Sequence, residues 1–223
     1  MHQIPITWRG ECVHGEIFNP KKACNLKLIG ARYYLKGYEQ EHGPLNTSET
    51  LEYQSPRDAN GHGTHTASTA VGSTVKMAWF SGFGQGTARG GTPRVGLVVY
   101  KVCWEDGKCS EDDILTAFDE AIHDGVNVIS ASFGSPLPLL PLYNSSSDIG
   151  SFHVMQKGIS VIFLAGNNEP DPSVVQNVAP WSTCVGALSN DQNFPIRVLL
   201  DNNLSFKIFH LEAQARFHPD ILK

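Results

Sequence analysis

Several features that would assign this chain of 223 residues to a class of protein are scarce or missing. Charged residues make up 17% of it, against roughly 25% in an average globular protein. No basic block occurs and the formal net charge is -5, so nucleic acid is not expected as a main partner. No apolar run approaches the roughly 20 residues of a membrane span, so no membrane partner is expected either. The start, MHQIPITWRGEC, lacks a basic region followed by an apolar stretch and is therefore not interpreted as a signal peptide.

Cysteine is also uncommon, but its spacing is informative. Five cysteines occur, and none of them forms the Cys-x-x-Cys spacing typical of a zinc site. Cys12 lies close to Cys24 and Cys103 lies close to Cys109, which predicts two disulfides and an oxidising compartment. The alternative is that these residues are unrelated buried thiols. Cys184 would then remain as the odd cysteine.

Apolar runs and helical spacing alternate along the middle of the chain. The predicted strands and helices occupy 95–104 (strand), 110–124 (helix), 126–134 (strand), 148–157 (helix), 159–167 (strand) and 182–188 (strand). This alternation predicts an α/β fold with a doubly wound, mostly parallel sheet and helices on both faces. In such sheets chemistry collects beyond the carboxyl ends of the strands, where Gly134 and Asn167 are expected.

The remaining segments have weaker patterns. The first sixty residues are rich in glycine, proline, asparagine and charge, which predicts irregular surface structure. Residues 80–94 are predicted to form a glycine-rich loop. Residues 204–223 differ from the preceding pattern and are expected to form an amphipathic helix or to fray.

One short stretch, ANGHGTHTASTAV at 59–71, places two histidines among very small side chains. A helix is predicted from Thr64 to Val71, so His62 sits at its positive end, which favours the neutral imidazole that a general base needs. A structural histidine is the simpler alternative. Zinc binding by His62 and His65 is not expected, because no glutamate lies between them and no third ligand is evident. No metal or other cofactor is therefore expected.

The stretch SPRDANGHGTHTASTA resembles the histidine motif of the subtilisin-like serine proteases, especially their plant cucumisin-like branch. Further landmarks of that branch follow in the family's order, from about Trp8 to about Asn203. They are CNLKLIGARYY, GQGTARGGTPR, VYKVCW, DDILTAFDEAIHDGVNVIS, DIGSFHVMQKGISVIFLAGN and APWSTCVGA. The resemblance implies a partial subtilisin-like fold, hydrolysis of peptide bonds, and a peptide or protein substrate.

The resemblance also implies residue roles. His62 falls where the family has its general base, whereas His65 falls on a helix position that is not catalytic. Asn167, which ends FLAGN, matches the asparagine of the oxyanion hole.

Two further stretches match the walls that hold the substrate. Ser132, Phe133 and Gly134 match the strand that pairs with the substrate backbone. Leu164, Ala165 and Gly166 match the other wall of the pocket for the side chain before the scissile bond. Without the histidine motif, both stretches are equally typical of ordinary buried strands.

The family's mechanism needs two groups besides the histidine, namely an aspartate in an Asp-Thr-Gly or Asp-Ser-Gly stretch and a serine in a Gly-Thr-Ser-Met stretch. Neither stretch occurs in these residues. Asp58 is near His62, but it does not hold the motif position of the missing aspartate. Residues 1–203 are therefore expected to be a part of a catalytic domain, truncated at both ends and inactive alone, and residues 204–223 a divergent tail. The family implies an extracellular location, in the apoplast or cell wall.

Two other functions remain as alternatives. The first is a non-catalytic module that keeps the substrate cleft and holds an extended peptide by strand addition. The second is nucleotide binding through GFGQG at 82–86, but no predicted strand precedes it and no Lys-Ser/Thr follows it.

Overall fold

The computed structural model describes residues 4–48, 51–80, 82–135, 138–168, 170–188, 195–199 and 204–209. Its helices and strands are α1 (Pro20–Ala23), β1 (Leu28–Tyr33), α2 (Lys36–His42), α3 (His62–Val71), β2 (Val75–Phe80), β3 (Phe83–Ala88), β4 (Leu97–Lys101), η1 (a 3₁₀ turn, Glu105–Gly107), α4 (Glu111–Asp124), β5 (Val128–Ala131), α5 (Ser146–Gln156), β6 (Ser160–Leu164), β7 (Thr183–Val185), β8 (Pro195–Leu199) and β9 (Ser205–Phe209). The chain divides into two compact units. The larger unit consists of Met1–Thr74 and Arg89–Ala187, and the smaller unit of Val75–Ala88 and Leu188–Lys223.

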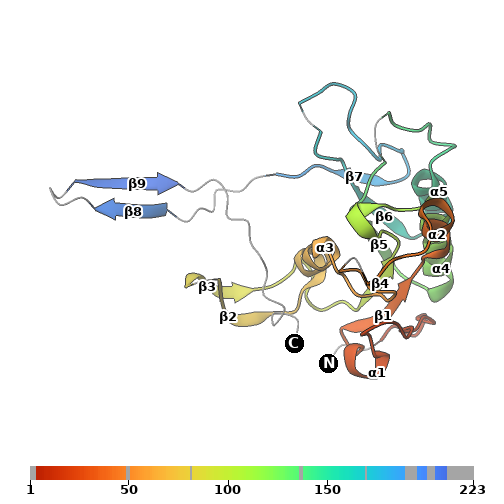
Figure 1. The fold of residues 1–223 in the computed structure, drawn as a ribbon, viewed down its shortest axis with the longest axis horizontal. Coiled ribbons are helices and arrows are strands. Elements are labelled where there is room, and N and C mark those ends of the chain that lie inside the picture. The colour runs from red at the N-terminus through yellow and green to blue at the C-terminus, as the bar shows by residue number, and fades with distance from the viewer. Residues whose placement is uncertain are drawn as a thin grey trace. The chain divides into compact units, whose positions relative to one another are not determined.

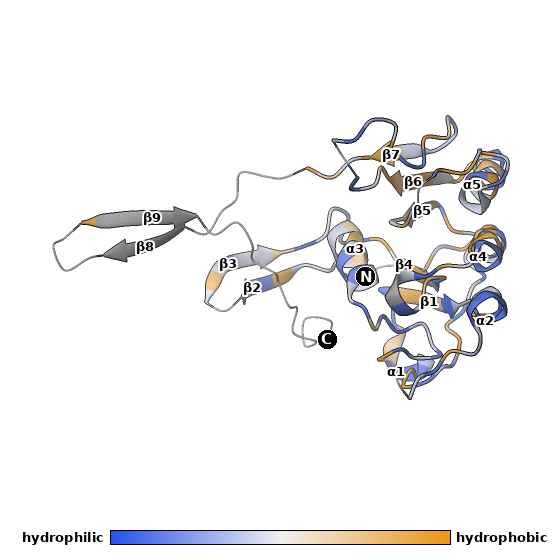
Figure 2. Ribbon diagram, turned by 45° about the horizontal axis from the view of Figure 1, so that its top comes forward, coloured by the Kyte–Doolittle hydropathy of each residue, from blue (hydrophilic) through white to orange (hydrophobic). Residues whose placement is uncertain are grey.

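The larger unit contains all the parallel strands (Figure 1). Strand β1 pairs with β4, and β5, β6 and β7 pair in that order, every pair being parallel. Figure 2 shows α2, α4 and α5 on one side of these strands and α3 on the other. The α/β class, the parallel strands and the helices on both faces are thus confirmed.

The sheet is divided, which the sequence did not predict. Among the described residues, β4 pairs only with β1, and β5 pairs only with β6. Helix α4 follows β4 and precedes β5 in the chain, yet no ladder joins these two strands. Contacts other than backbone pairing therefore hold the two sheets together.

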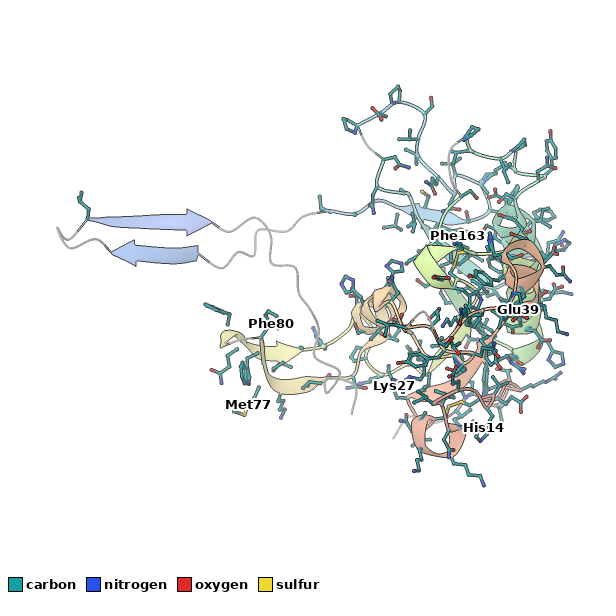
Figure 3. All side chains as sticks on the ribbon, in the orientation of Figure 1. His14, Lys27, Glu39, Met77, Phe80 and Phe163 are labelled. Carbon is teal, nitrogen blue, oxygen red and sulfur yellow. A yellow bond between two sulfur atoms is a disulfide. The ribbon has the colours of Figure 1, made fainter. Side chains whose placement is uncertain are left out.

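A shared apolar core supplies those contacts. It is built from strand and helix residues that face one another, namely Val102, Ile114, Ala117, Phe118, Ala131, Val154, Val161 and Phe163. Phe163 of β6, labelled in Figure 3, lies edge-on to Phe118 of α4 with ring centroids 6.3 Å apart. The apolar residues of α4, which recur at helical spacing, thus form one side of the helix that is buried against both sheets.

A buried carboxylate fastens the end of α4 to the first sheet. Asp124 is fully buried and accepts hydrogen bonds from Arg32 Nε at 3.0 Å and Arg32 Nη2 at 3.1 Å. The Tyr100 hydroxyl donates to the same carboxylate at 2.8 Å. Burial, followed by this hydrogen bond, raises the pKa of Tyr100. Arg32 lies on β1 and Tyr100 on β4, so one carboxylate joins three elements.

The other end of α4 holds α2. The buried carboxylate of Asp113 accepts the backbone N–H groups of Gly37 at 3.0 Å and Tyr38 at 2.9 Å. Ser110 occupies the N-cap position of α4 as expected, but its hydroxyl donates to Glu41 Oε1 at 2.6 Å instead of capping the helix. A side chain at Gly37 would collide with Ser110, so glycine permits this close approach.

Three expectations from the sequence were wrong. The first sixty residues are not irregular throughout, because they contain β1 and α2. In the smaller unit, part of the expected loop at 80–94 is strand β3, which pairs antiparallel with β2. Residues 205–209 form strand β9, paired with β8, and not a helix. Residues 210–223 lie outside the described part of the chain. None of the described helices has the length and apolar content needed to cross a bilayer.

Both predicted disulfides are confirmed, Cys12 with Cys24 and Cys103 with Cys109. Cys12 forms a bridge with Ala31 of β1, and Cys24 caps the end of α1. The first disulfide therefore ties the segment beside β1 to α1. Cys184 has a free thiol, which donates to the carbonyl of Gln176 at 3.2 Å.

Replacing Cys12 and Cys24 by serine should lower the free energy of unfolding by about 2–4 kcal/mol, because the unfolded chain regains the freedom that the loop removed. Urea denaturation of the full chain measures this difference. Cys184→Ser is the control and should change stability much less. Equal midpoints for the double variant and the parent chain would contradict the prediction.

Candidate active site

His62 is the first residue of α3, and the backbone before it is shaped for a sharp entry into the helix. Gly61 adopts a φ of 97°, a left-handed conformation that glycine tolerates best. The His62 side chain is exposed. Apart from His62, His65 and Val71, the helix consists of alanine, serine, threonine and glycine, and none of its residues is buried.

Asp58 holds this entry in place. Its carboxylate accepts the backbone N–H groups of Asn60 (3.1 Å), Gly61 (2.8 Å) and Thr64 (2.6 Å). Partial burial alone would raise the pKa of Asp58, but the hydrogen bonds from Thr64, Gly61 and Asn60 outweigh it and lower this pKa. Gly61 is the N-cap residue of α3, and Asp58, three residues earlier, acts as a cap by accepting the N–H of Thr64 in the first turn.

The His62 ring reaches the end of strand β5. Its Nε2 lies 2.9 Å from the backbone carbonyl oxygen of Ser132, seventy residues further along the chain. A carbonyl oxygen only accepts hydrogen bonds, so this contact requires Nε2 to carry the hydrogen. Two of the residues singled out in the sequence therefore meet.

The two expected walls run side by side. Ala131 of β5 is in register with Phe163 of β6, so Ser132–Gly134 and Leu164–Gly166 continue from neighbouring parallel strands. Ala165 is buried, and its N–H donates to the carbonyl of Val185 at 2.9 Å.

Two residues that the sequence did not single out join these walls. The Asn177 amide donates to the carbonyls of Phe133 at 3.2 Å and Leu164 at 2.9 Å. The Gln176 N–H donates to the carbonyl of Ala165 at 2.8 Å. The one sequence signal for Gln176 and Asn177 is their position just before the APWSTCVGA stretch.

Gln176 also fills the space that two glycines leave. A Cβ at Gly134 would collide with Gln176 Oε1, and a Cβ at Gly166 would lie 3.3 Å from Gln176 Nε2. Gly166 has a φ of 96°, after which Asn167 is exposed. The site is thus lined by backbone groups, one imidazole and side-chain amides.

His65 lies on α3, three residues beyond His62, and is exposed. One group of potential metal ligands occurs in the described part of the chain, namely Glu120, His123 and Asp124. Since Asp124 already accepts from Arg32 and Tyr100, this group is better suited to an ion pair than to a metal.

The glycine-rich stretch at 82–86 does not have the setting of a nucleotide loop. It lies within the hairpin of β2 and β3, so a strand does precede it, contrary to expectation. The same stretch continues as strand β3 and does not open a helix, which phosphate binding of this kind requires.

Comparison with known proteins identifies the family. The model described as "Subtilase family" matches residues 36–209. The chain belongs to the subtilase family. It is 56% identical to "Subtilisin-like protease SBT3.18" of Arabidopsis thaliana, over 98% of this chain and 28% of that relative. It is 48% identical to "Subtilisin-like protease SBT3.9" of the same plant, over 91% of this chain and 26% of that relative.

This subtilase chain thus spans about a quarter of the length of these curated relatives. Among solved structures, "Sphericase" aligns with a TM-score of 0.48 and 28% identity, covering 70% of this chain and 46% of that protein. The "S41 Psychrophilic Protease" aligns with a TM-score of 0.45 and 27% identity, covering 72% and 48%.

Asp58→Ala should lower the free energy of unfolding by about 0.5–2 kcal/mol at neutral pH, the usual effect of losing a helix cap. Because the folded-state pKa of Asp58 is lowered, this stabilisation is full above the unfolded carboxyl pKa of about 3.9 and is lost as the pH falls further. Urea denaturation across this range measures it.

Asp119→Ala, which removes an exposed carboxylate from the middle of α4, is the matched control and should show little of this effect. A stability difference between the parent chain and Asp58→Ala that persists unchanged at pH 2 would contradict the role assigned to the Asp58 charge.

Proposed function

We propose that this chain is a part of the catalytic region of a secreted serine endopeptidase, which hydrolyses peptide bonds in extended substrates. The observation that carries the proposal is the contact of His62 Nε2 with the Ser132 carbonyl, at the point where the two walls begin. Membership of the subtilase family supports it.

In this proposal His62 is the general base and Asn167 donates its side-chain amide to the developing oxyanion. The base must accept a proton at Nε2, so the imidazole has to leave the Ser132 carbonyl before it can act. A hydroxyl nucleophile and an orienting carboxylate are also needed, and the motif stretches that carry them in the family do not occur among these 223 residues.

The substrate backbone is proposed to pair with Ser132, Phe133 and Gly134 as an added strand. Leu164, Ala165 and Gly166 then form the opposite wall. The space beside Gly134 is occupied by Gln176, so the added strand is proposed to pair through backbone groups alone.

Residues 1–203 are proposed to belong to the catalytic domain and residues 204–223 to a divergent tail. No metal or other cofactor is required, and nucleic acid or membrane partners are not proposed. The two disulfides favour an oxidising compartment, and the family makes an extracellular location in the apoplast or cell wall the proposed one.

The purified chain of 223 residues should hydrolyse no peptide bond, because the proposal assigns it only the base and the oxyanion donor. Incubation with a mixed peptide library, followed by mass spectrometry, tests this. Cleavage that is lost in His62→Ala would show that the missing groups are present after all. Cleavage that survives His62→Ala would overturn the proposed site.

A non-catalytic peptide-binding module remains the second candidate function, favoured by the two bridged walls. Both candidates predict that an extended peptide binds and that Gly134→Val weakens binding, because the new side chain collides with Gln176. Gly186→Val is the control, since a Cβ there meets no atom within 4 Å. Isothermal titration calorimetry measures the peptide affinity of the parent chain and of each variant. Equal affinities of Gly134→Val and the parent chain would contradict strand pairing at Ser132–Gly134.

A further inference from the structure

Three Asn-x-Ser stretches occur in the chain, and none of them takes part in the proposed site. They begin at Asn46, Asn144 and Asn203. Such a stretch accepts an N-linked oligosaccharide in secreted proteins, but so short a pattern also arises by chance. Asn203 lies outside the described residues. The surroundings of the other two asparagines therefore decide what can be inferred.

Asn46 lies on the surface shortly after the end of α2, next to an anchored residue. Gly43, with a φ of 85°, ends this helix, and Leu45 is buried with Tyr38 and Trp104 in a small apolar cluster. Burial of Leu45 holds the backbone in place, whereas the next residue, Asn46, is exposed. An oligosaccharide joined to Asn46 would therefore extend into solvent and displace no residue of the core.

The first of these stretches forms a turn in which its third residue contacts its asparagine. Asn46 Oδ1 accepts hydrogen bonds from the Ser48 hydroxyl at 2.7 Å and from the Ser48 backbone N–H at 3.2 Å. A backbone N–H only donates, so this contact identifies the Asn46 atom as the carboxamide oxygen. Both donors also stabilise the negative charge that builds on this oxygen when the amide nitrogen gives up a proton.

Asn144 is also exposed, but the rest of its stretch forms the start of α5. Ser145 is buried at the N-cap position, where its hydroxyl accepts the N–H of Asp148 at 3.3 Å. Ser146 is the first residue of the helix, and its N–H donates to Glu111 Oε2 at 2.7 Å. The N–H that holds the asparagine in the first stretch is thus engaged elsewhere in this one. The same turn could form here only if the first turn of α5 opened.

We propose that Asn46 is a site of N-linked glycosylation and that it is modified in preference to Asn144. The co-reactant is an oligosaccharide carried on a lipid diphosphate. Asn46 Nδ2 forms a bond to the anomeric carbon of the sugar, the bond from this carbon to the diphosphate oxygen breaks, and the amide proton passes to a base of the transferring enzyme. The inference rests on the extracellular location proposed above, which the two disulfides favour, and not on the peptidase activity.

The test places the full chain behind a cleavable secretion signal and translates it with endoplasmic-reticulum microsomes, which supply the lipid-linked oligosaccharide. The parent chain should migrate more slowly on a denaturing gel than the chain translated without microsomes, and peptide N-glycosidase F should remove this difference. Asn46→Gln should abolish the main shift. Asn144→Gln, the matched control at the other exposed asparagine, should retain it.

Ser48 provides a second test that leaves Asn46 in place. Ser48→Ala should abolish the modification because the hydroxyl is lost, and Ser48→Thr should retain it because threonine supplies the same donor. Mass spectrometry then locates the modified residue, since the glycosidase leaves aspartate where it has removed an oligosaccharide. Asn46 is the only asparagine between Lys36 and Arg57, so the tryptic peptide from this interval reports on Asn46 alone.

The outcomes separate this inference from the proposed function. The microsomes supply the compartment and no substrate, so an unmodified Asn46 would overturn the glycosylation site and leave the peptidase proposal standing. Modification of Asn144 to the same extent as Asn46, or to a greater extent, would overturn the preference inferred from α5. Failure of extended peptides to bind at Ser132–Gly134 would instead contradict the proposed cleft, and a modified Asn46 would still support the inference.

Discussion

The packing of α4 across one face of two separately paired sheets is the constraint on which the larger unit depends. Ile114 and Phe118 of this helix share one buried cluster with Ala131 of β5 and Phe163 of β6, although no backbone ladder links β4 to β5. At its end, Asp124 binds groups from β1 and β4. Apolar contacts and one buried ion pair thus hold these strands together, a role that hydrogen-bonded pairing has in a continuous sheet.

This constraint also positions the candidate site. The core fixes β5 and β6, and the register of Ala131 with Phe163 makes the following segments neighbours. His62 arrives from the opposite face of the strands, on α3, whose entry depends on Gly61 and Asp58. Backbone pairing therefore fixes the positions of the two walls, and the hydrogen bonds of Asp58 fix the start of the helix that carries His62. Exposed Asn167, one residue past Gly166, has less of this support.

The sequence predicted those parts of the fold whose signals are local. Strands β4 to β7 are apolar, β-branched runs, and α4 repeats its apolar residues at helical spacing. Strand β1 was missed because Arg32 breaks its apolar run, and the buried partner of Arg32, Asp124, lies 92 residues away in the sequence. Likewise, nothing near Asn177 reveals that its amide joins two carbonyls on different strands. Long-range polar partners are invisible to periodicity, and the bridged walls depend on them.

The geometry of His62 also restricts how the site could be completed. While Nε2 donates to the Ser132 carbonyl, Nδ1 of the neutral ring carries no hydrogen, so a carboxylate can accept a hydrogen bond from Nδ1 only once the ring has left this contact. Asp58 is badly placed for this role, since its oxygens already accept three backbone N–H groups at the start of α3. Moving it to the ring would uncap the helix that carries His62. In the proposed mechanism, the acid that orients His62 is therefore a residue other than Asp58.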